Sequence, residues 1–145
     1  MIVNGVDSPV YKVTQSGFDT HVNQPGMQAN ALYHVGTNLA AFAETLKRAG
    51  VWDQVLVVTY SEFGRRIKEN RGQGTDHGTA SVNLVMGGRV RRGIYGRHPN
   101  LNPQRLDQND NVAHTTDFRS IYATLAQRWW HQPNLWQGHQ PLPFV

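Results

Sequence analysis

Two short stretches of the chain each place an aspartate close to a histidine. Asp19 and His21 are separated by one residue, and Asp76 and His77 are adjacent. In an extended segment, residues two apart project to the same side, so Asp19 and His21 would present a carboxylate and an imidazole together. Both groups are good ligands for divalent ions. A single D-x-H is nevertheless more often a chance surface occurrence, so this pair predicts a metal site only in combination with other residues.

The second pair is flanked by glycines, in the order Gly74-Thr75-Asp76-His77-Gly78. Glycine frees the backbone, so the adjacent side chains of Asp76 and His77 can converge on one point. The alternative is a turn in which Asp76 accepts hydrogen bonds from local amides and His77 is exposed.

A third acidic residue, Glu62, follows a continuous β-branched run, Val55–Tyr60. Such a run is typical of a strand covered on both faces in a parallel sheet. Glu62 would then emerge at the carboxyl edge of the sheet, where α/β proteins place ligands and where Asp19 is also expected. The alternative is an acid at the start of a helix, where it interacts favourably with the helix dipole.

Basic residues are concentrated just after Glu62. The formal net charge is +4, with 14 lysines and arginines in all, and only Glu69 and Asp76 oppose the basic residues of this region. Its members are Arg65, Arg66, Lys68, Arg71, Arg89, Arg91, Arg92 and Arg97. Such a patch attracts anions, and the guanidinium of Arg65 is suited to a phosphate or sulfate oxyanion. A solvated face with ordinary salt bridges is the alternative.

The first half of the chain predicts a strand, a long helix and a second strand. Tyr11–Thr14 is a candidate short strand, and the region from Met27 to Ala49 has helical periodicity ending at Gly50. The predicted buried stripe of this helix consists of Leu32, Val35, Leu39, Phe42, Leu46 and Ala49. With the strand Val55–Tyr60, these elements predict a βαβ unit.

The second half predicts a strand at Ser81–Met86, a long surface loop over residues 96–113, and a helix with Asp117 in its first turn. The predicted buried face of that helix consists of Phe118, Ile121, Tyr122, Leu125 and Trp129. Residues 131–145 are expected to form an irregular, proline-containing tail. We therefore predict an α/β fold with a mostly parallel sheet flanked by helices, formed by residues 1–145 as a single domain.

Composition excludes several classes of protein. The chain has 145 residues, 39% of them hydrophobic and 17% charged, which is typical of one globular domain. No apolar run approaches the roughly 18 to 20 residues of a membrane span. With 0 cysteines, the chain has no disulfide, no thiolate zinc site and no cysteine nucleophile.

Together, the acids and imidazoles predict one site, because loops at the same edge of a sheet meet. The predicted metal ligands are Asp19, His21, Glu62, Asp76 and His77. Three carboxylates and two imidazoles suit zinc, manganese or another divalent ion, and lack the all-oxygen character of a calcium cage.

Four motifs in this order resemble a known bacterial family. They are Gly17-Phe18-Asp19-Thr20-His21 with Gln24, Ser61-Glu62-Phe63-Gly64-Arg65 with Asn70, Gly74-Thr75-Asp76-His77-Gly78, and Thr116-Asp117-Phe118-Arg119 with Tyr122. The family is domain of unknown function 1501, identified here as a sulfatase-like branch of the alkaline-phosphatase superfamily. The resemblance extends from about Ser16 to Trp130.

The resemblance implies an alkaline-phosphatase-like, doubly wound sheet, of which this chain would be the C-terminal part only, and hydrolysis of phosphate or sulfate esters at a metal centre. Asp19 and His21 look like one Asp-His metal pair of that superfamily. A second pair follows a strand as S-D-H-G, and here Phe63 replaces its histidine while Glu62 keeps the acid. Either the Asp76-His77 pair supplies the missing imidazole, or His77 matches a later single histidine of the superfamily.

The resemblance also implies a Ser, Thr or modified Cys nucleophile in a preceding region, often behind a twin-arginine export signal. This chain shows neither, so we expect a fragment or short paralogue that does not complete the reaction alone, from a full-length protein that is exported or periplasmic. The alternative function is a non-catalytic module that binds anionic glycans through the basic residues. Nucleic-acid binding is a weaker alternative, and self-association through sheet edges is possible.

Overall fold

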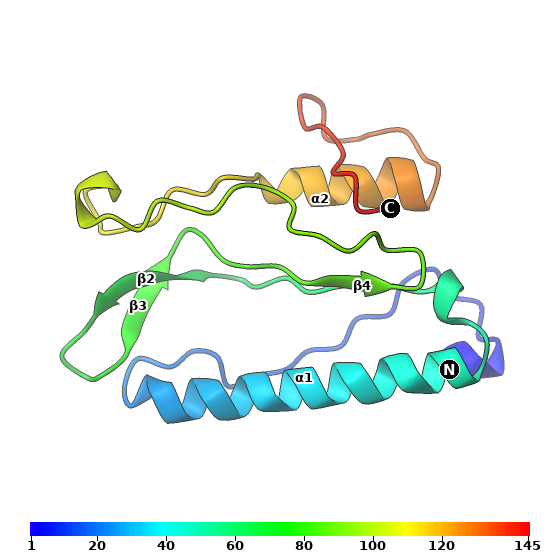
Figure 1. Ribbon diagram of the computed structural model, residues 1–145, viewed down its shortest axis with the longest axis horizontal. Helices are drawn as coiled ribbons and strands as arrows, with labels where there is room; N and C mark the ends of the chain where they lie inside the picture. The colour runs from blue at the N-terminus through cyan, green and yellow to red at the C-terminus, as the bar shows by residue number, and fades with distance from the viewer. The chain divides into compact units, whose positions relative to one another are not determined.

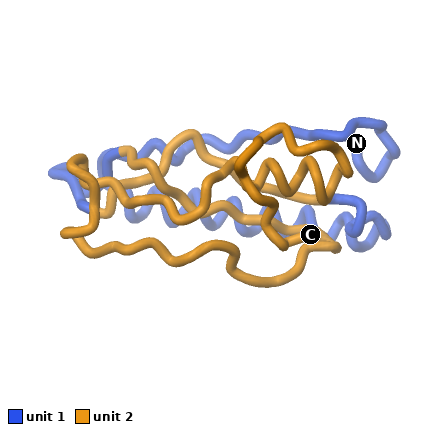
Figure 2. Tube along the Cα trace, turned by 90° about the horizontal axis from the view of Figure 1, so that it is seen from above, with its two compact units in different colours: residues 1–55, 68–76 blue, residues 56–67, 77–145 orange.

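The computed structural model describes residues 1–145, which divide into two compact units (Figure 2). Unit 1 comprises Met1–Val55 and Lys68–Asp76, and unit 2 comprises Leu56–Ile67 and His77–Val145. Each unit is therefore assembled from two stretches of the chain.

Unit 1 is dominated by one long helix, α1 (Gln24–Arg48), labelled in Figure 1. Pro25 lies in its first turn, where the fixed φ of proline suits a helix and no amide hydrogen is missed. Lys47 and Arg48 lie in the last turn, where positive charge offsets the helix dipole. The chain then reverses at Gly50, whose φ of 69° favours glycine. The predicted helix at 27–49 is confirmed and begins slightly earlier.

The stripe that α1 buries differs in part from the predicted one. Leu46 is buried, as predicted. Val35 and Leu39 are only half-buried, and the remaining members of the predicted stripe, Leu32, Phe42 and Ala49, are exposed. Ala31 and Ala43 are buried in addition to Leu46. The helix therefore packs through small side chains on a face slightly rotated from the predicted one.

The segment before α1 contains only a short 3-10 turn, η1 (Ile2–Asn4), and runs back beside the helix (Figure 1). The side-chain amide of Gln15 donates to the carbonyl of Ala31 over 3.1 Å, which ties the segment to α1. The predicted strand at Tyr11–Thr14 is wrong, because no strand pairs with this segment and side-chain contacts hold it instead.

Unit 2 contains a two-stranded antiparallel sheet of β1 (Leu56–Val58) and β4 (Val85–Gly87). Val57 faces Met86, and the pairing is extended by a 2.9 Å hydrogen bond from the amide of Thr59 to the carbonyl of Leu84. The strands predicted at 55–60 and 81–86 therefore exist as shorter elements. Residues Val55 to Thr59 are half-buried, not covered on both faces.

The second sheet is the hairpin of β2 (Gly64–Glu69) and β3 (Thr75–Gly78), labelled in Figure 1. A tight turn of residues 70–74 joins the strands, and the amide of Asn70 donates to the carbonyl of Gly74 over 2.8 Å. The turn end of the hairpin, Lys68–Asp76, belongs to unit 1 and its open end belongs to unit 2.

These sheets overturn the predicted fold class. The mostly parallel, alkaline-phosphatase-like α/β sheet is wrong, because the structure has two small sheets of two strands each and no parallel pair between helices. A βαβ unit needs a strand on each side of α1, and residues 11–14 provide none. An apolar run such as Val55–Tyr60 indicates that a strand will be partly covered, but does not determine which segment pairs with it or in which direction.

The α-helix of unit 2, α2 (Phe118–Thr124), continues into a π-helical turn, η4 (Leu125–Trp129). Ala123, Thr124 and Ala126 are buried, whereas Phe118, predicted to be buried, is exposed. Residues 131–145 form no helix or strand, yet they are anchored: Phe144 is 1% exposed, and the amide of Leu142 donates to the Thr124 hydroxyl over 2.7 Å.

The long segment at 96–113 contains one short 3-10 turn, η3 (Pro103–Arg105), and no strand. No helix in the chain combines the length and hydrophobicity that crossing a bilayer requires.

Candidate metal site

The site in unit 1 is assembled where the β2–β3 turn meets the chain just before α1. The amide of Asn23 donates to the carbonyl of Gly72, and that of Gln24 to the carbonyl of Gln73, each over 2.9 Å. The first amides of a helix have no partner within it, and no side chain caps α1. The turn therefore supplies the missing acceptors and binds two segments that are distant in sequence.

Two glycines make this close approach possible. A Cβ added at Gly74 would lie 2.4 Å from the carbonyl oxygen of His21, and one at Gly72 would lie 2.9 Å from the same atom. Any larger residue at Gly74 would push the turn away from His21. The spacing Asn70-Arg71-Gly72-Gln73-Gly74 is thus a requirement of this contact.

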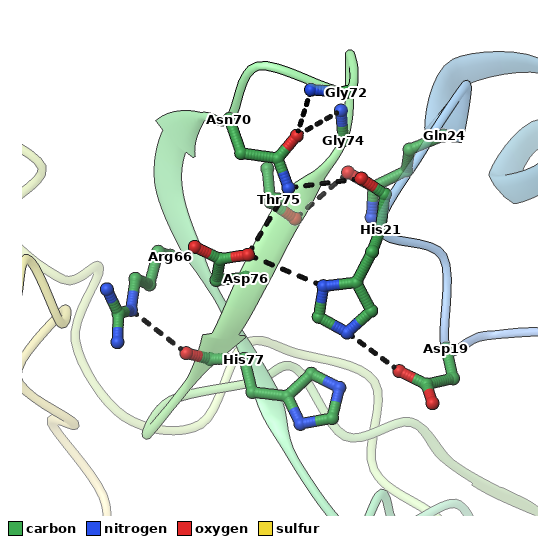
Figure 3. Close-up of polar contacts among 10 residues, drawn as sticks. All are labelled: Asp19, His21, Gln24, Arg66, Asn70, Gly72, Gly74, Thr75, Asp76 and His77. Atoms are coloured by element: carbon green, nitrogen blue, oxygen red, sulfur yellow. Dashed lines mark hydrogen bonds and ion pairs between the residues drawn. The ribbon is translucent and has the colours of Figure 1, made fainter.

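The contact places the imidazole of His21 between two carboxylates (Figure 3). Its Nε2 lies 3.1 Å from Oδ1 of Asp19, and its Nδ1 lies 3.4 Å from Oδ1 of Asp76, a residue 55 positions later in the chain. The side chains of His21, Asp19 and Asp76 are 44%, 67% and 51% exposed. A small cation in solution can therefore reach all three groups.

Asn70 lies at the centre of the polar network. Its Oδ1 accepts from the amides of Gly72 and Gly74, over 2.8 and 3.1 Å. Its Nδ2 donates to the carbonyl of His21 over 3.1 Å and to Oδ1 of Asp76 over 3.2 Å (Figure 3). The side-chain amide thus uses its two donors and both lone pairs of its oxygen.

A second link joins β3 to α1. The hydroxyl of Thr75 donates to Oε1 of Gln24 over 2.9 Å. The side-chain NH₂ group of Gln24 donates to Oε1 of Gln28, one turn later, over 3.4 Å. Gln24 and Asn70 both lie within the motifs that resemble the family, but the sequence predicted no role for either residue. The glycine-rich turn and the start of the helix are each recognisable in the sequence. That the two lie against each other is decided by the tertiary structure.

In unit 2, His77 stacks on Phe63, with ring centroids 3.7 Å apart and planes at 7°. The guanidinium carbon of Arg65 lies 5.1 Å from the centroid of Phe63, within the range of a cation–π contact. Nε of Arg66 donates to the carbonyl of His77 over 3.1 Å. Arg66 thus forms a hydrogen bond within the hairpin, and the ring of Phe63 packs against the imidazole of His77.

The remaining predicted ligand, Glu62, is exposed in the loop between β1 and β2. No helix begins there, so the alternative of an acid at a helix start is wrong. For Asp76 and His77, the alternative of a turn is also wrong, because both lie within strand β3.

Unit 2 also has an Asp-His contact that the sequence did not reveal. Asp117 caps α2 by accepting from the amide of Arg119 over 2.9 Å, and its carboxylate forms a two-point ion pair with the guanidinium of Arg119, at 2.9 and 2.6 Å. Nδ1 of His139 lies 3.9 Å from the same carboxylate. Hydrogen bonds from Arg119 hold the pKa of the Asp117 carboxyl far below its usual range.

Comparison with known proteins gives a single result. No curated protein and no solved structure matches the chain. The sequence profile of the family described as "Protein of unknown function (DUF1501)" matches residues 3–140. The motif resemblance is thereby confirmed at the level of the family, and nearly all of the chain, including every residue of the site, lies within the match. The chain belongs to the DUF1501 family.

Proposed function

We propose that this chain holds a divalent metal ion, zinc or manganese, for the hydrolysis of phosphate or sulfate esters. The observation that carries the proposal is the imidazole of His21 held between the carboxylates of Asp19 and Asp76 in an exposed position. Two carboxylates around one imidazole concentrate negative charge, which attracts a cation.

The proposed ligands in unit 1 are the carboxylate of Asp19 and the imidazole of His21, both of them exposed. A carboxylate and an imidazole are donors that zinc accepts readily, and two such ligands leave coordination positions for water or substrate. The carboxylate of Asp76 lies beside the same imidazole. The other ligands that the sequence predicted, Glu62 and His77, are both exposed in unit 2. When bound, the ion would polarise an ester oxygen and lower the pKa of a coordinated water.

The chain's own residues would contribute charge and positioning. Arg65, stacked on Phe63, is proposed to stabilise the oxyanion of the substrate, because a guanidinium matches the geometry of phosphate and sulfate oxygens. The same proposal includes a relationship of this chain to the sulfatase-like enzymes. The order of the four motifs supports that relationship, whereas the two small sheets do not.

Metal content and hydrolysis together test the proposal. The purified protein is dialysed against zinc or manganese, analysed for bound metal, and assayed with p-nitrophenyl phosphate and p-nitrophenyl sulfate. We expect about one equivalent of metal, and its loss in His21→Ala. The matched control is His34→Ala, since His34 is exposed on α1 and is not one of the proposed ligands. Full metal binding by His21→Ala, or none by the unaltered protein, would contradict the proposed ligand set.

A second function is favoured by one observation. Arg89, Arg91, Arg92 and Arg97 are all exposed in unit 2, within nine residues of one another in sequence. Such a segment suits a sulfated or phosphorylated glycan. Binding to heparin that persists in EDTA and weakens steeply with salt would support a glycan-binding module, and loss of binding in EDTA would favour the metal site.

A further inference from the structure

We propose that Asp76 is a positioning residue and not a metal ligand: it holds Nδ1 of His21 so that Nε2 faces the ion, and Asn70 in turn holds Asp76. This inference rests on the proposed function, because it assigns roles within the same metal site. It divides the two carboxylates beside His21 into one that binds the ion and one that orients the imidazole.

The first step concerns the two ring nitrogens. A histidine that binds a metal through one nitrogen commonly donates the hydrogen on the other to a carboxylate, which fixes the tautomer and the ring orientation. His21 has a carboxylate at each nitrogen, Asp19 at Nε2 and Asp76 at Nδ1. One of the two is therefore placed to share the ion with His21, and the other to accept its N–H.

The second step decides which carboxylate accepts the N–H. Oδ1 of Asp76, the oxygen that faces Nδ1, also accepts a hydrogen bond from Asn70 over 3.2 Å. Two hydrogen bonds occupy the two lone pairs of that oxygen, so it has none left for an ion. Asp19 is the more exposed carboxylate, 67% against 51%, and is better placed to exchange water for a cation. The ion therefore belongs on the Asp19 side.

The third step explains why Asn70 faces Asp76 in this orientation. The amides of Gly72 and Gly74 both donate to one atom of the Asn70 side chain, which must therefore be its oxygen. The NH₂ group is then directed at the carbonyl of His21 and at Asp76. If the side-chain amide were reversed, its NH₂ group would face the amide hydrogens of Gly72 and Gly74, and its oxygen would face the carbonyl of His21 and the carboxylate of Asp76. The turn thus fixes Asn70, Asn70 fixes Asp76, and Asp76 fixes His21.

Asp76→Asn tests the assignment, because the substitution preserves shape and an acceptor oxygen but removes the charge. Cobalt(II) is used as the probe, since its visible absorption reports the number and geometry of ligands. We expect Asp76→Asn to bind Co²⁺ about 10- to 100-fold more weakly with the same spectral shape, as for loss of an orienting carboxylate. Asp19→Asn should change the spectrum itself. Asp7→Asn, an exposed aspartate of unit 1 outside the site, is the control.

Asn70→Asp provides a second, independent variant. The new carboxylate keeps an acceptor for Gly72 and Gly74 but turns its other oxygen towards Asp76 and the His21 carbonyl, both of which are acceptors. We expect it to weaken Co²⁺ binding at least as much as Asp76→Asn while leaving the spectral shape unchanged, with circular dichroism confirming that α1 is retained.

The outcomes separate this inference from the function on which it rests. If the unaltered protein binds no Co²⁺, the proposed function fails and this inference fails with it. If the unaltered protein binds Co²⁺ and Asp76→Asn alters the spectrum as Asp19→Asn does, Asp76 is a ligand and only this inference is overturned. Undiminished Co²⁺ affinity in Asp76→Asn would overturn it equally.

Discussion

Each unit of the molecule brings an aspartate to a histidine, and the two clusters differ in exposure and in the groups beside the imidazole. In unit 1, His21 lies between Asp19 and Asp76, and all three side chains are 44% exposed or more. In unit 2, Asp117 is 22% exposed and already carries a two-point ion pair with Arg119. Proximity of an acid to an imidazole is therefore insufficient for a metal site. The first cluster is distinguished by its greater exposure and by the second carboxylate beside its imidazole.

The largest effect that this comparison predicts is on metal affinity. His21→Ala should weaken zinc binding by about 100-fold or more, because a ligand is lost, whereas His139→Ala should leave zinc binding unchanged. Isothermal titration of both variants with zinc measures the difference. Equal losses in the two variants would show that the clusters do not differ in the way proposed.

The next effect is on the free energy of unfolding and concerns the turn of residues 70–74, which packs against His21 in unit 1. Gly74→Ala places a Cβ 2.4 Å from the His21 carbonyl, so the backbone must move, and we expect a loss of about 1–3 kcal/mol in the free energy of unfolding. Gly36→Ala is the matched control, because it lies within α1 with nothing within 4 Å of the added Cβ. Its better helix propensity should stabilise the protein by about 0.5–1 kcal/mol.

Urea denaturation followed by circular dichroism measures both glycine variants. Because Gly74 contacts the segment of His21, Gly74→Ala should also weaken zinc binding, which Gly36→Ala should not. A stable Gly74→Ala variant with normal zinc affinity would show that the turn does not position His21.

The smallest effect concerns Asp117 in unit 2. Its folded-state pKa is lowered by Arg119, so its stabilising contribution is fully present above its unfolded-state pKa of about 4 and is lost as the pH falls below that value. Asp117→Ala should cost about 1 kcal/mol at pH 7, as for other helix N-caps, and should flatten the acid-side decline in stability. Urea midpoints between pH 7 and pH 3 test this expectation.

The same pH series carries its own control. Asp7→Asn, at an exposed aspartate with no helix to cap, should leave the decline in place. If Asp117→Ala retained the decline of the unaltered protein, the Arg119 pair would not contribute to stability.

Local patterns in the sequence were sufficient for several features. The helical periodicity before Gly50, with basic residues in the last turn, predicted α1 to within a few residues. The second helix was predicted with Asp117 in its first turn, and α2 begins directly after Asp117, which is its N-cap. The order of the four motifs predicted the family. Each of these depends on residues that are neighbours along the chain, whose preferences do not require a distant partner.

Only the tertiary structure decided which distant segments meet. Val55–Tyr60 predicted a strand, but its partner proved to be the antiparallel β4 and not a parallel strand before α1. The acid opposite Nδ1 of His21 is Asp76, 55 residues away, and it is brought there by a turn whose glycines accept close backbone contact. Pairing of strands and convergence of side chains depend on hydrogen bonds between segments remote in sequence. No local preference encodes those bonds, so the residues could be identified from the sequence and their partners could not.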